Sequence, residues 1–158
     1  MKPVTEPILL AAANAFDFGG PVVCDGRHYG EGHINDTYLV WRADHSKRFI
    51  LQRINTDTFT DPVGLMENVC GVTRHLSRKI LAEGGDPMRE TLNVVPTLSG
   101  STCYLDAEGG AWRVYDFVEG TVCLQQVGCE ADFRTVAETL GKFQNQLADY
   151  PASTLHET

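Results

Sequence analysis

The sequence predicts an α+β fold: an antiparallel sheet of about five strands covered by one long helix, with a further helix at each end. Strand-like runs of apolar and aromatic residues follow one another across tight turns, which favours antiparallel pairing. One long segment between the third and fourth runs repeats apolar residues at helical spacing. A chain of 158 residues is long enough to bury a single core.

Three strands are predicted within residues 21–55, in "PVVCDGRHYGEG", "INDTYLVWRA" and "RFILQRI". The intervening "ADHSK" is typical of a hairpin turn. After the long helix, "LNVVPTLSGS", "TCYLDAEGG" and "AWRVYDFVEG" predict two or three more strands. "DAEGG" is the expected turn between the last two of them.

Three helices are expected. The first spans about Thr5 to Phe16. The long helix begins with Asp61 as N-cap and Pro62 at its first position, and "EGGDP" ends it near Leu81. The last spans about Asp132 to Ala148. The stripes that predict the two longer helices are Leu65, Val69, Val72, Leu76 and Ile80, and then Phe133, Val136, Leu140, Phe143 and Leu147.

Composition argues against several classes of function. A formal net charge of −8 disfavours nonspecific binding to nucleic acid or to an anionic membrane surface. No apolar run approaches the ~18 residues of a membrane span. The five cysteines are never spaced as CxxC, which disfavours a disulfide framework and a zinc site and indicates a reducing, cytoplasmic location.

The glycine pair in "YGEGHINDTYLV" is the first candidate site. Gly30 and Gly32 lie at a predicted hairpin tip, where backbone N–H groups can approach phosphate oxygens because no Cβ intervenes. Asn35, which tolerates positive φ, stands where a protein-kinase loop has another glycine. Thr37 adds a hydroxyl, and His33 lies in the same loop. The alternative is a plain hairpin; a P-loop is excluded because no Gly-Lys-Ser/Thr follows.

Five segments in order, "YGEGHINDTYLV", "FILQRIN", "DPVGLMENV", "VYDFVEG" and "LGKFQNQLADYP", resemble the N-terminal lobe of the aminoglycoside-phosphotransferase-like kinases. Within that superfamily, the sequences of these segments are most similar to the N-acetylhexosamine 1-kinases, some of which are also labelled mucin desulfatase. The resemblance implies ATP with Mg²⁺, and a sugar or other small-molecule hydroxyl as acceptor. It divides the chain into an N-terminal helix (1–17), a nucleotide-binding lobe ending in a hinge (18–120) and the start of a C-terminal lobe (121–158).

In such kinases a cation on the third strand contacts the phosphates and pairs with a glutamate of the following helix. Gln52 and Arg53 are the candidates, and strand alternation lets only one face inward. We predict Arg53, because a guanidinium binds phosphate bidentately; the alternative is a solvent-facing strand arginine. The resemblance assigns its partner role to Glu67, although helical spacing sets this residue away from the apolar stripe. Glu67 as a solvated surface residue is therefore the alternative.

"RVYDFVEG" resembles the hinge, where the adenine would hydrogen-bond to the backbone of Asp116 and Val118. A plain edge strand ending at Gly120 is compatible with this assignment. Tyr115 would lie at the back of the adenine pocket or in the core.

The resemblance places the catalytic aspartate and the metal ligands in the C-terminal lobe, beyond its start at residues 121–158. No HxD-type loop occurs here, and no DFG-like segment follows the predicted hinge, so we expect no catalytic residue, no metal ligand and no activity of this chain alone. The alternative is a non-enzymatic α+β interaction or dimerisation module. We also expect self-association as a two-fold dimer through residues 133–147, unless the last helix folds back onto its own sheet.

Overall fold

The computed structural model, which describes residues 3–122 and 126–158, contains one antiparallel sheet of six strands. The strand order is β1-β2-β3-β6-β4, and the short β5 pairs with the start of β6. This confirms the predicted α+β class. The strands are β1 (Val22–His28), β2 (Asp36–Arg42), β3 (Arg48–Ile54), β4 (Val94–Val95), β5 (Tyr104–Leu105) and β6 (Ala111–Asp116).

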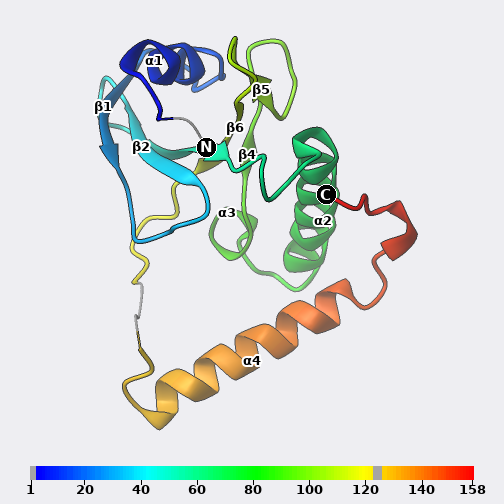
Figure 1. Ribbon diagram of the computed structural model, residues 1–158. Coiled ribbons are helices and arrows are strands. Elements are labelled where there is room, and N and C mark those ends of the chain that lie inside the picture. The colour runs from blue at the N-terminus through cyan, green and yellow to red at the C-terminus, as the bar shows by residue number, and fades with distance from the viewer. Residues whose placement is uncertain (1–2, 123–125) are drawn as a thin grey trace.

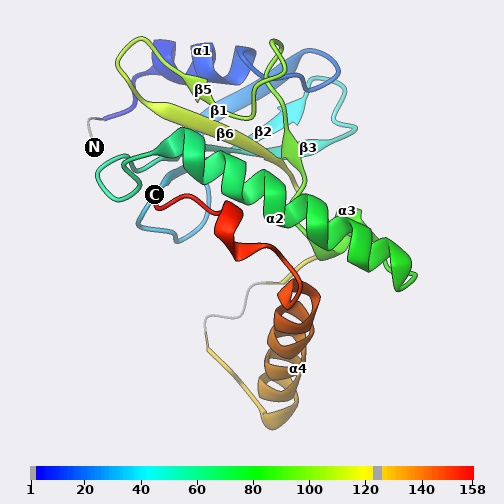
Figure 2. The same cartoon turned by 90° about the vertical axis from the view of Figure 1, so that its right-hand side faces the viewer.

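Helices lie on both faces of the sheet, α1 on one and α2 on the other, while α4 stands apart (Figures 1 and 2). The Asp61 side chain accepts a hydrogen bond from the Gly64 N–H at 2.9 Å, which confirms the predicted cap of α2. The helices are α1 (Glu6–Asn14), α2 (Pro62–Ala82), α3 (Pro87–Glu90), α4 (Glu130–Leu147) and the 3₁₀ turn η1 (Ala152–Thr154).

The short helix α3 was not predicted. It begins with the same pair of signals as α2, an aspartate followed by a proline. The Asp86 carboxylate accepts a hydrogen bond from the Met88 N–H at 3.0 Å. "EGGDP" therefore ends one helix and caps the next.

Strand alternation sends successive side chains to opposite faces, so the sheet carries two cores. The core on the α1 side is the larger and contains Leu9, Ala12, Ala13, Phe16, Phe18, Tyr38, Val40, Phe49, Leu51, Val95, Trp112 and Val114. The core on the α2 side contains Ile54, Met66 and Ala111, with Phe59, Leu65, Val69, Cys70, Val94 and Cys103 packed against it. The α2 contacts are therefore concentrated at one end of the sheet.

The two predicted hairpin turns are confirmed. Between β2 and β3, His45 adopts a φ of 58°. Between β5 and β6, the Asp106 carboxylate accepts hydrogen bonds from the N–H groups of Glu108 at 2.9 Å and Gly110 at 2.8 Å. An aspartate that binds the backbone of its own turn in this way fixes the geometry of the hairpin.

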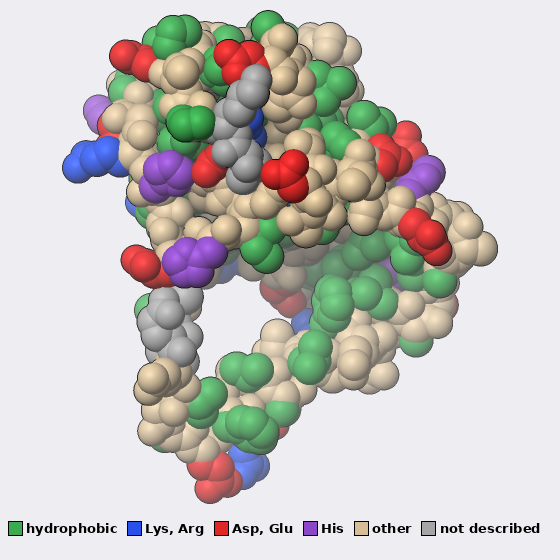
Figure 3. All heavy atoms as spheres, viewed as in Figure 1, with side chains coloured by type: hydrophobic (Ala, Val, Ile, Leu, Met, Phe, Trp, Pro, Cys, Tyr) green, Lys and Arg blue, Asp and Glu red, His purple; other side chains and the backbone are tan. Residues whose placement is uncertain are grey.

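Helix α4 is anchored to α2 at its C-terminal end. The Nε2 atom of His75 lies 3.0 Å from the carbonyl oxygen of Gln146, and Lys79 pairs with Asp149 at 2.7 Å. The rest of α4 extends away from the lobe (Figure 3), and Phe133 is 65% exposed. The alternative in which this helix folds back and buries its stripe on the sheet is therefore wrong.

No helix within residues 3–122 or 126–158 combines the length and the apolar character needed to cross a bilayer. Cys24, Cys70, Cys103 and Cys129 are free thiols. Cys123, the remaining cysteine, lies outside the described residues.

Candidate nucleotide-binding site

The glycine loop joins β1 to β2. Gly30 has a φ of +82°, a conformation that favours glycine, and a Cβ added at Gly30 or Gly32 would meet no atom within 4 Å. At the base of the loop, the Tyr29 N–H donates to the carbonyl oxygen of Thr37 at 2.8 Å. The tip is therefore a hairpin with exposed backbone, as phosphate binding would require.

Asn35 and His33 differ in their surroundings. The Oδ1 atom of Asn35 accepts a hydrogen bond from the Asn55 N–H at 2.9 Å, which ties the glycine loop to the residue after β3. His33 is exposed in the loop. Asn35 thus supports the loop, whereas the side chain of His33 is open to solvent.

The base of the glycine loop packs on the segment that follows β6. The rings of Tyr29 and Phe117 meet edge to face, with centroids 5.9 Å apart. The Arg48 guanidinium lies 4.0 Å from the centroid of Phe117, and its Nε–H donates to Glu119 at 2.8 Å. These hydrogen bonds hold the pKa of Glu119 below its usual range. The loop and the predicted hinge are therefore in direct contact.

The predicted hinge residues Asp116 and Val118 lie on either side of Phe117. The Asp116 N–H donates to the carbonyl oxygen of Asn93 at 2.9 Å, and its carboxylate pairs with Lys47 at 2.7 Å. Within the described residues, the Val118 N–H has no hydrogen-bond acceptor. Val118 therefore offers the free backbone donor that the adenine assignment needs.

An open apolar face lies beside the loop and the hinge. It comprises the side chains of β1, β2 and β3 that point to the α2 side, but the helix covers mainly the other end of the sheet. The members of this open face belong to neither core cluster and remain half-buried or exposed: Val23, Leu39, Trp41 and Ile50. Flat apolar surface next to a few polar groups is typical of a site for an aromatic base.

Gln52 and Arg53 point to opposite faces, and the structure gives the α2 face to Gln52. Its Nε2–H donates to the hydroxyl of Thr37 at 2.9 Å, and its Oε1 accepts from Nε and Nη2 of Arg113 at 2.9 and 2.7 Å. Thr37, Gln52 and Arg113 are direct neighbours across β2, β3 and β6. These three side chains form a polar row that begins with Thr37 at the base of the glycine loop.

Arg53 does not join this row. It is 7% exposed, lies on the α1 face with Leu51, and pairs with Asp36 at 3.9 Å. The prediction that Arg53 rather than Gln52 faces inward is therefore wrong by one residue of strand register, because Gln52 is the residue that shares a face with Thr37. The sequence "RFILQRI" could not decide this, because apolar residues occupy both of its faces.

Glu67 lies on α2 as a surface residue, with its side chain 60% exposed, and pairs with His156 at 2.6 Å. Its neighbour Asn68 exchanges two hydrogen bonds with the backbone of His156, at 2.9 and 2.8 Å. The predicted pairing of Glu67 with Arg53 is wrong. Glu67 instead helps to hold the C-terminal segment against α2.

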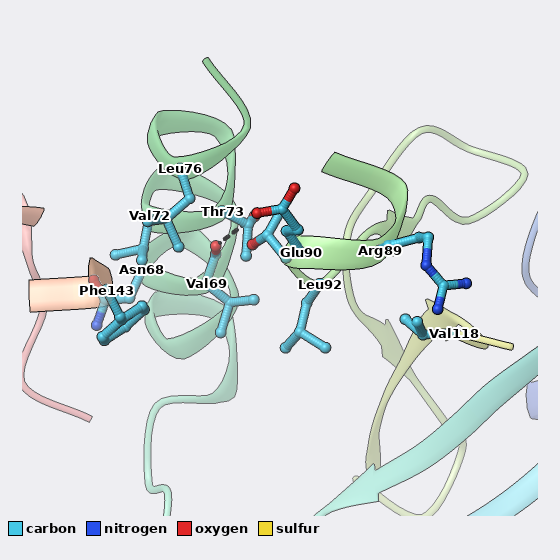
Figure 4. A pocket seen from close by; sticks show the side chains of 11 residues that line it. Asn68, Val69, Val72, Thr73, Leu76, Arg89, Glu90, Leu92, Val118 and Phe143 are labelled. Atoms are coloured by element: carbon cyan, nitrogen blue, oxygen red, sulfur yellow. Dashed lines mark hydrogen bonds between the residues drawn. The ribbon is translucent and has the colours of Figure 1, made fainter. Parts of the chain in front are cut away.

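A cavity of about 570 Å³ lies between α2, α3, the segment after β6 and α4 (Figure 4). Its walls are mainly apolar, and it meets the predicted site only at Val118. The Arg89 guanidinium donates to the carbonyl oxygen of Glu119 at 2.9 Å. The apolar lining consists of Val69, Val72, Leu76, Leu92, Val118 and Phe143.

Sequence reasoning missed Tyr29, Phe117 and Arg113. The signal for Arg113 was present, because alternation along "AWRVYD" places it on the face opposite Trp112 and Val114. Tyr115 shares that face, and burial raises the pKa of its hydroxyl. Tyr29 and Phe117 could not be paired from sequence, since their contact depends on how the loop folds across the sheet.

A search against protein-family models finds no family that matches this chain. Within residues 3–122 and 126–158, no three His, Cys, Asp or Glu side chains gather so that they could hold a metal ion.

Proposed function

We propose that this chain is the ATP-binding lobe of a phosphotransferase that acts on a hydroxyl of a sugar, such as an N-acetylhexosamine, or of another small molecule. The observation that carries the proposal is the contact between the glycine loop and the hinge. The rings of Tyr29 and Phe117 join the base of the glycine loop to the predicted hinge, where the Val118 N–H has no acceptor among the described residues. The open apolar face adjoins both.

In this arrangement the base would lie on the open apolar face and hydrogen-bond to the Val118 N–H. The phosphates would extend beneath the loop, toward its backbone N–H groups and the hydroxyl of Thr37. Charge stabilisation and positioning supply most of the catalysis in phosphoryl transfer, so a lobe that only binds and orients ATP is a coherent part of such an enzyme. The acceptor hydroxyl is part of the same proposal and rests on the sequence resemblance.

The described residues fit the nucleotide better than they fit Mg²⁺. They offer backbone N–H groups, a hydroxyl and an arginine, which are ligands for phosphate oxygens. They do not gather a set of metal ligands. We therefore derive no step through a metal ion in this chain, and we expect ATP to bind weakly.

Titration with ATP tests the proposal. We expect saturable shifts of the amide resonances of Tyr29 to Thr37 and of Val118. Gly30→Ala should weaken binding, because the added Cβ strains a φ of +82° at the loop tip. Gly100→Ala is a matched control with a φ of +84° in another turn, and it should leave ATP affinity unchanged. Shifts confined to the cavity around Phe143 would contradict the proposed site.

The exposed side of α4 favours a second function, in which the chain is a non-enzymatic interaction module that self-associates. Its apolar residues recur at alternating steps of three and four, the spacing of a coiled-coil seam. The exposed fractions are 65% for Phe133, 57% for Val136, 55% for Leu140 and 43% for Phe143. The acidic residues Glu130 and Asp132 lie at one end, so antiparallel pairing keeps the like charges of two copies apart.

Light scattering at increasing concentration measures this association. We expect Leu140→Glu to shift the chain toward monomer, because a charge at the centre of the seam would be desolvated on pairing. Ala131→Glu adds the same charge away from the seam, so the average mass of the particles measured by light scattering should match that of the wild type. A wild-type chain that stays monomeric at millimolar concentration would rule out the self-associating module.

A further inference from the structure

We propose that Arg113, held by Gln52, forms with Thr37 a binding site for the oxygens of a polyphosphate. The proposal rests on the proposed nucleotide function only in taking the polyphosphate to be part of ATP. The anion site itself rests on the charge and the hydrogen bonds of the polar row.

The first observation is the charge of Arg113. Within the described residues, it is the one cation that is shielded from solvent and forms no ion pair with a carboxylate. Arg74, Arg78 and Arg89, which also form none, are exposed. The paired cations are Arg27, Arg42, Lys47, Arg48, Arg53, Lys79, Arg134 and Lys142.

The neighbours of Arg113 are neutral. Its Nε–H and one Nη2–H donate to the single amide oxygen of Gln52, and its guanidinium lies 5.2 Å from the ring centroid of Tyr115. Neither neighbour carries a negative charge. A half-buried guanidinium without a counter-ion is stabilised by binding an anion, and its planar set of donors suits phosphate oxygens.

Gln52 orients the two polar groups at the ends of the row, the Arg113 guanidinium and the Thr37 hydroxyl. By accepting from Arg113 it fixes the guanidinium, and by donating to Thr37 it occupies a lone pair of that hydroxyl. The hydroxyl proton of Thr37 is then left to donate to another acceptor. The row therefore presents a hydroxyl donor at one end and a cation at the other.

The length of the row selects the anion. Thr37 and Arg113 lie on the strands either side of β3, so their backbones are about 10 Å apart across two strand spacings. A chain of phosphates that begins under the glycine loop can reach Arg113, whereas a single phosphate can contact only one end. We therefore expect tripolyphosphate to bind more tightly than inorganic phosphate.

The test measures the affinities of ATP, tripolyphosphate and adenosine by calorimetry with the full chain. Arg113→Gln should weaken the binding of ATP and of tripolyphosphate by roughly 10- to 100-fold, as expected for the loss of a charge-assisted contact. Adenosine should bind equally well to both proteins. Arg78→Gln removes the same charge from an exposed position on α2 and should leave all three affinities unchanged.

The outcomes separate the two proposals. If ATP binds and Arg113→Gln has no effect on it, the anion site is wrong and the nucleotide function stands. If tripolyphosphate binds through Arg113 but adenosine does not bind and ATP binds no more tightly than tripolyphosphate, the anion site stands and the nucleotide function fails. If tripolyphosphate does not bind at all, the anion site is overturned.

A measurement on the wild-type chain covers the case in which Arg113→Gln fails to fold. The Nε–H resonance of Arg113 should move on titration with tripolyphosphate, and that of the exposed Arg89 should not. If both resonances move alike, the anion binds the surface nonspecifically and the proposed site is wrong.

Discussion

Arg53→Ala should lower the free energy of unfolding by about 3–5 kcal/mol, the range measured when one partner of a buried ion pair is removed. Arg53 is 7% exposed, pairs with Asp36 and lies beside Asp106 in the turn before β6. A Cβ added at Gly110 would lie 3.0 Å from Nε of Arg53 and 2.4 Å from Oδ2 of Asp106, which shows how closely the groups pack. Removing the cation leaves the buried Asp106 carboxylate poorly compensated.

Urea unfolding, followed by circular dichroism, measures this loss. Arg53→Met is the matched control, because it keeps the aliphatic stem of the side chain and removes only the charge and its hydrogen bonds. Since Arg53 lies on the α1 face, folded Arg53→Met should bind ATP like the wild type. A reduced ATP affinity with unchanged stability would instead mean that Arg53 faces the nucleotide, as the sequence alone suggested.

Asp106→Ala should lower the free energy of unfolding by a similar amount, about 3–5 kcal/mol. The 8% exposed carboxylate of Asp106 accepts the indole N–H of Trp112 at 2.7 Å in addition to two backbone N–H groups of its own turn. Alanine leaves the buried donors of Trp112 and Gly110 without this acceptor. Asp106→Asn retains one carbonyl oxygen as acceptor, so its loss of stability should be smaller.

The same carboxylate should make the stability of the fold depend on pH. Burial raises the pKa of Asp106, but the hydrogen bonds from Trp112 and the turn outweigh it and hold the pKa below its usual range. Its contribution to stability is then complete above the unfolded aspartate pKa near 4, and is lost as the pH falls through the lower folded value. The wild type should therefore lose stability more steeply below pH ~4 than Asp106→Asn, as measured by urea unfolding across that range.

The two residues should be coupled. Because Arg53 and Asp106 share one buried network, the double variant should lose less stability than the sum of the single losses. A double variant whose loss equals that sum would show that they act independently, contrary to the contact seen around Gly110.

The sequence by itself determined which segments form strands and helices. These signals are local: Asp61 and Pro62 begin α2, and "DAEGG" makes the turn in which Asp106 binds its own backbone. Tight turns also determine that neighbouring strands pair antiparallel, and so the sequence predicted the α+β class. The position of Gly30 in an exposed hairpin follows from the same local pattern.

Only the tertiary structure decided which side chains share a face. Helices cover both faces of the sheet, so "RFILQRI" has apolar residues at both its odd-numbered and its even-numbered positions. Strand alternation alone therefore could not decide whether Gln52 or Arg53 faces α2. Arg113 entered the candidate site for a related reason, because it is β6 rather than another strand that pairs with β3 there. The stripe on α4 was equally ambiguous, since helical spacing predicts an apolar face but does not show whether the same chain covers it. Contacts between residues far apart in sequence decide each of these points, and no local pattern encodes them.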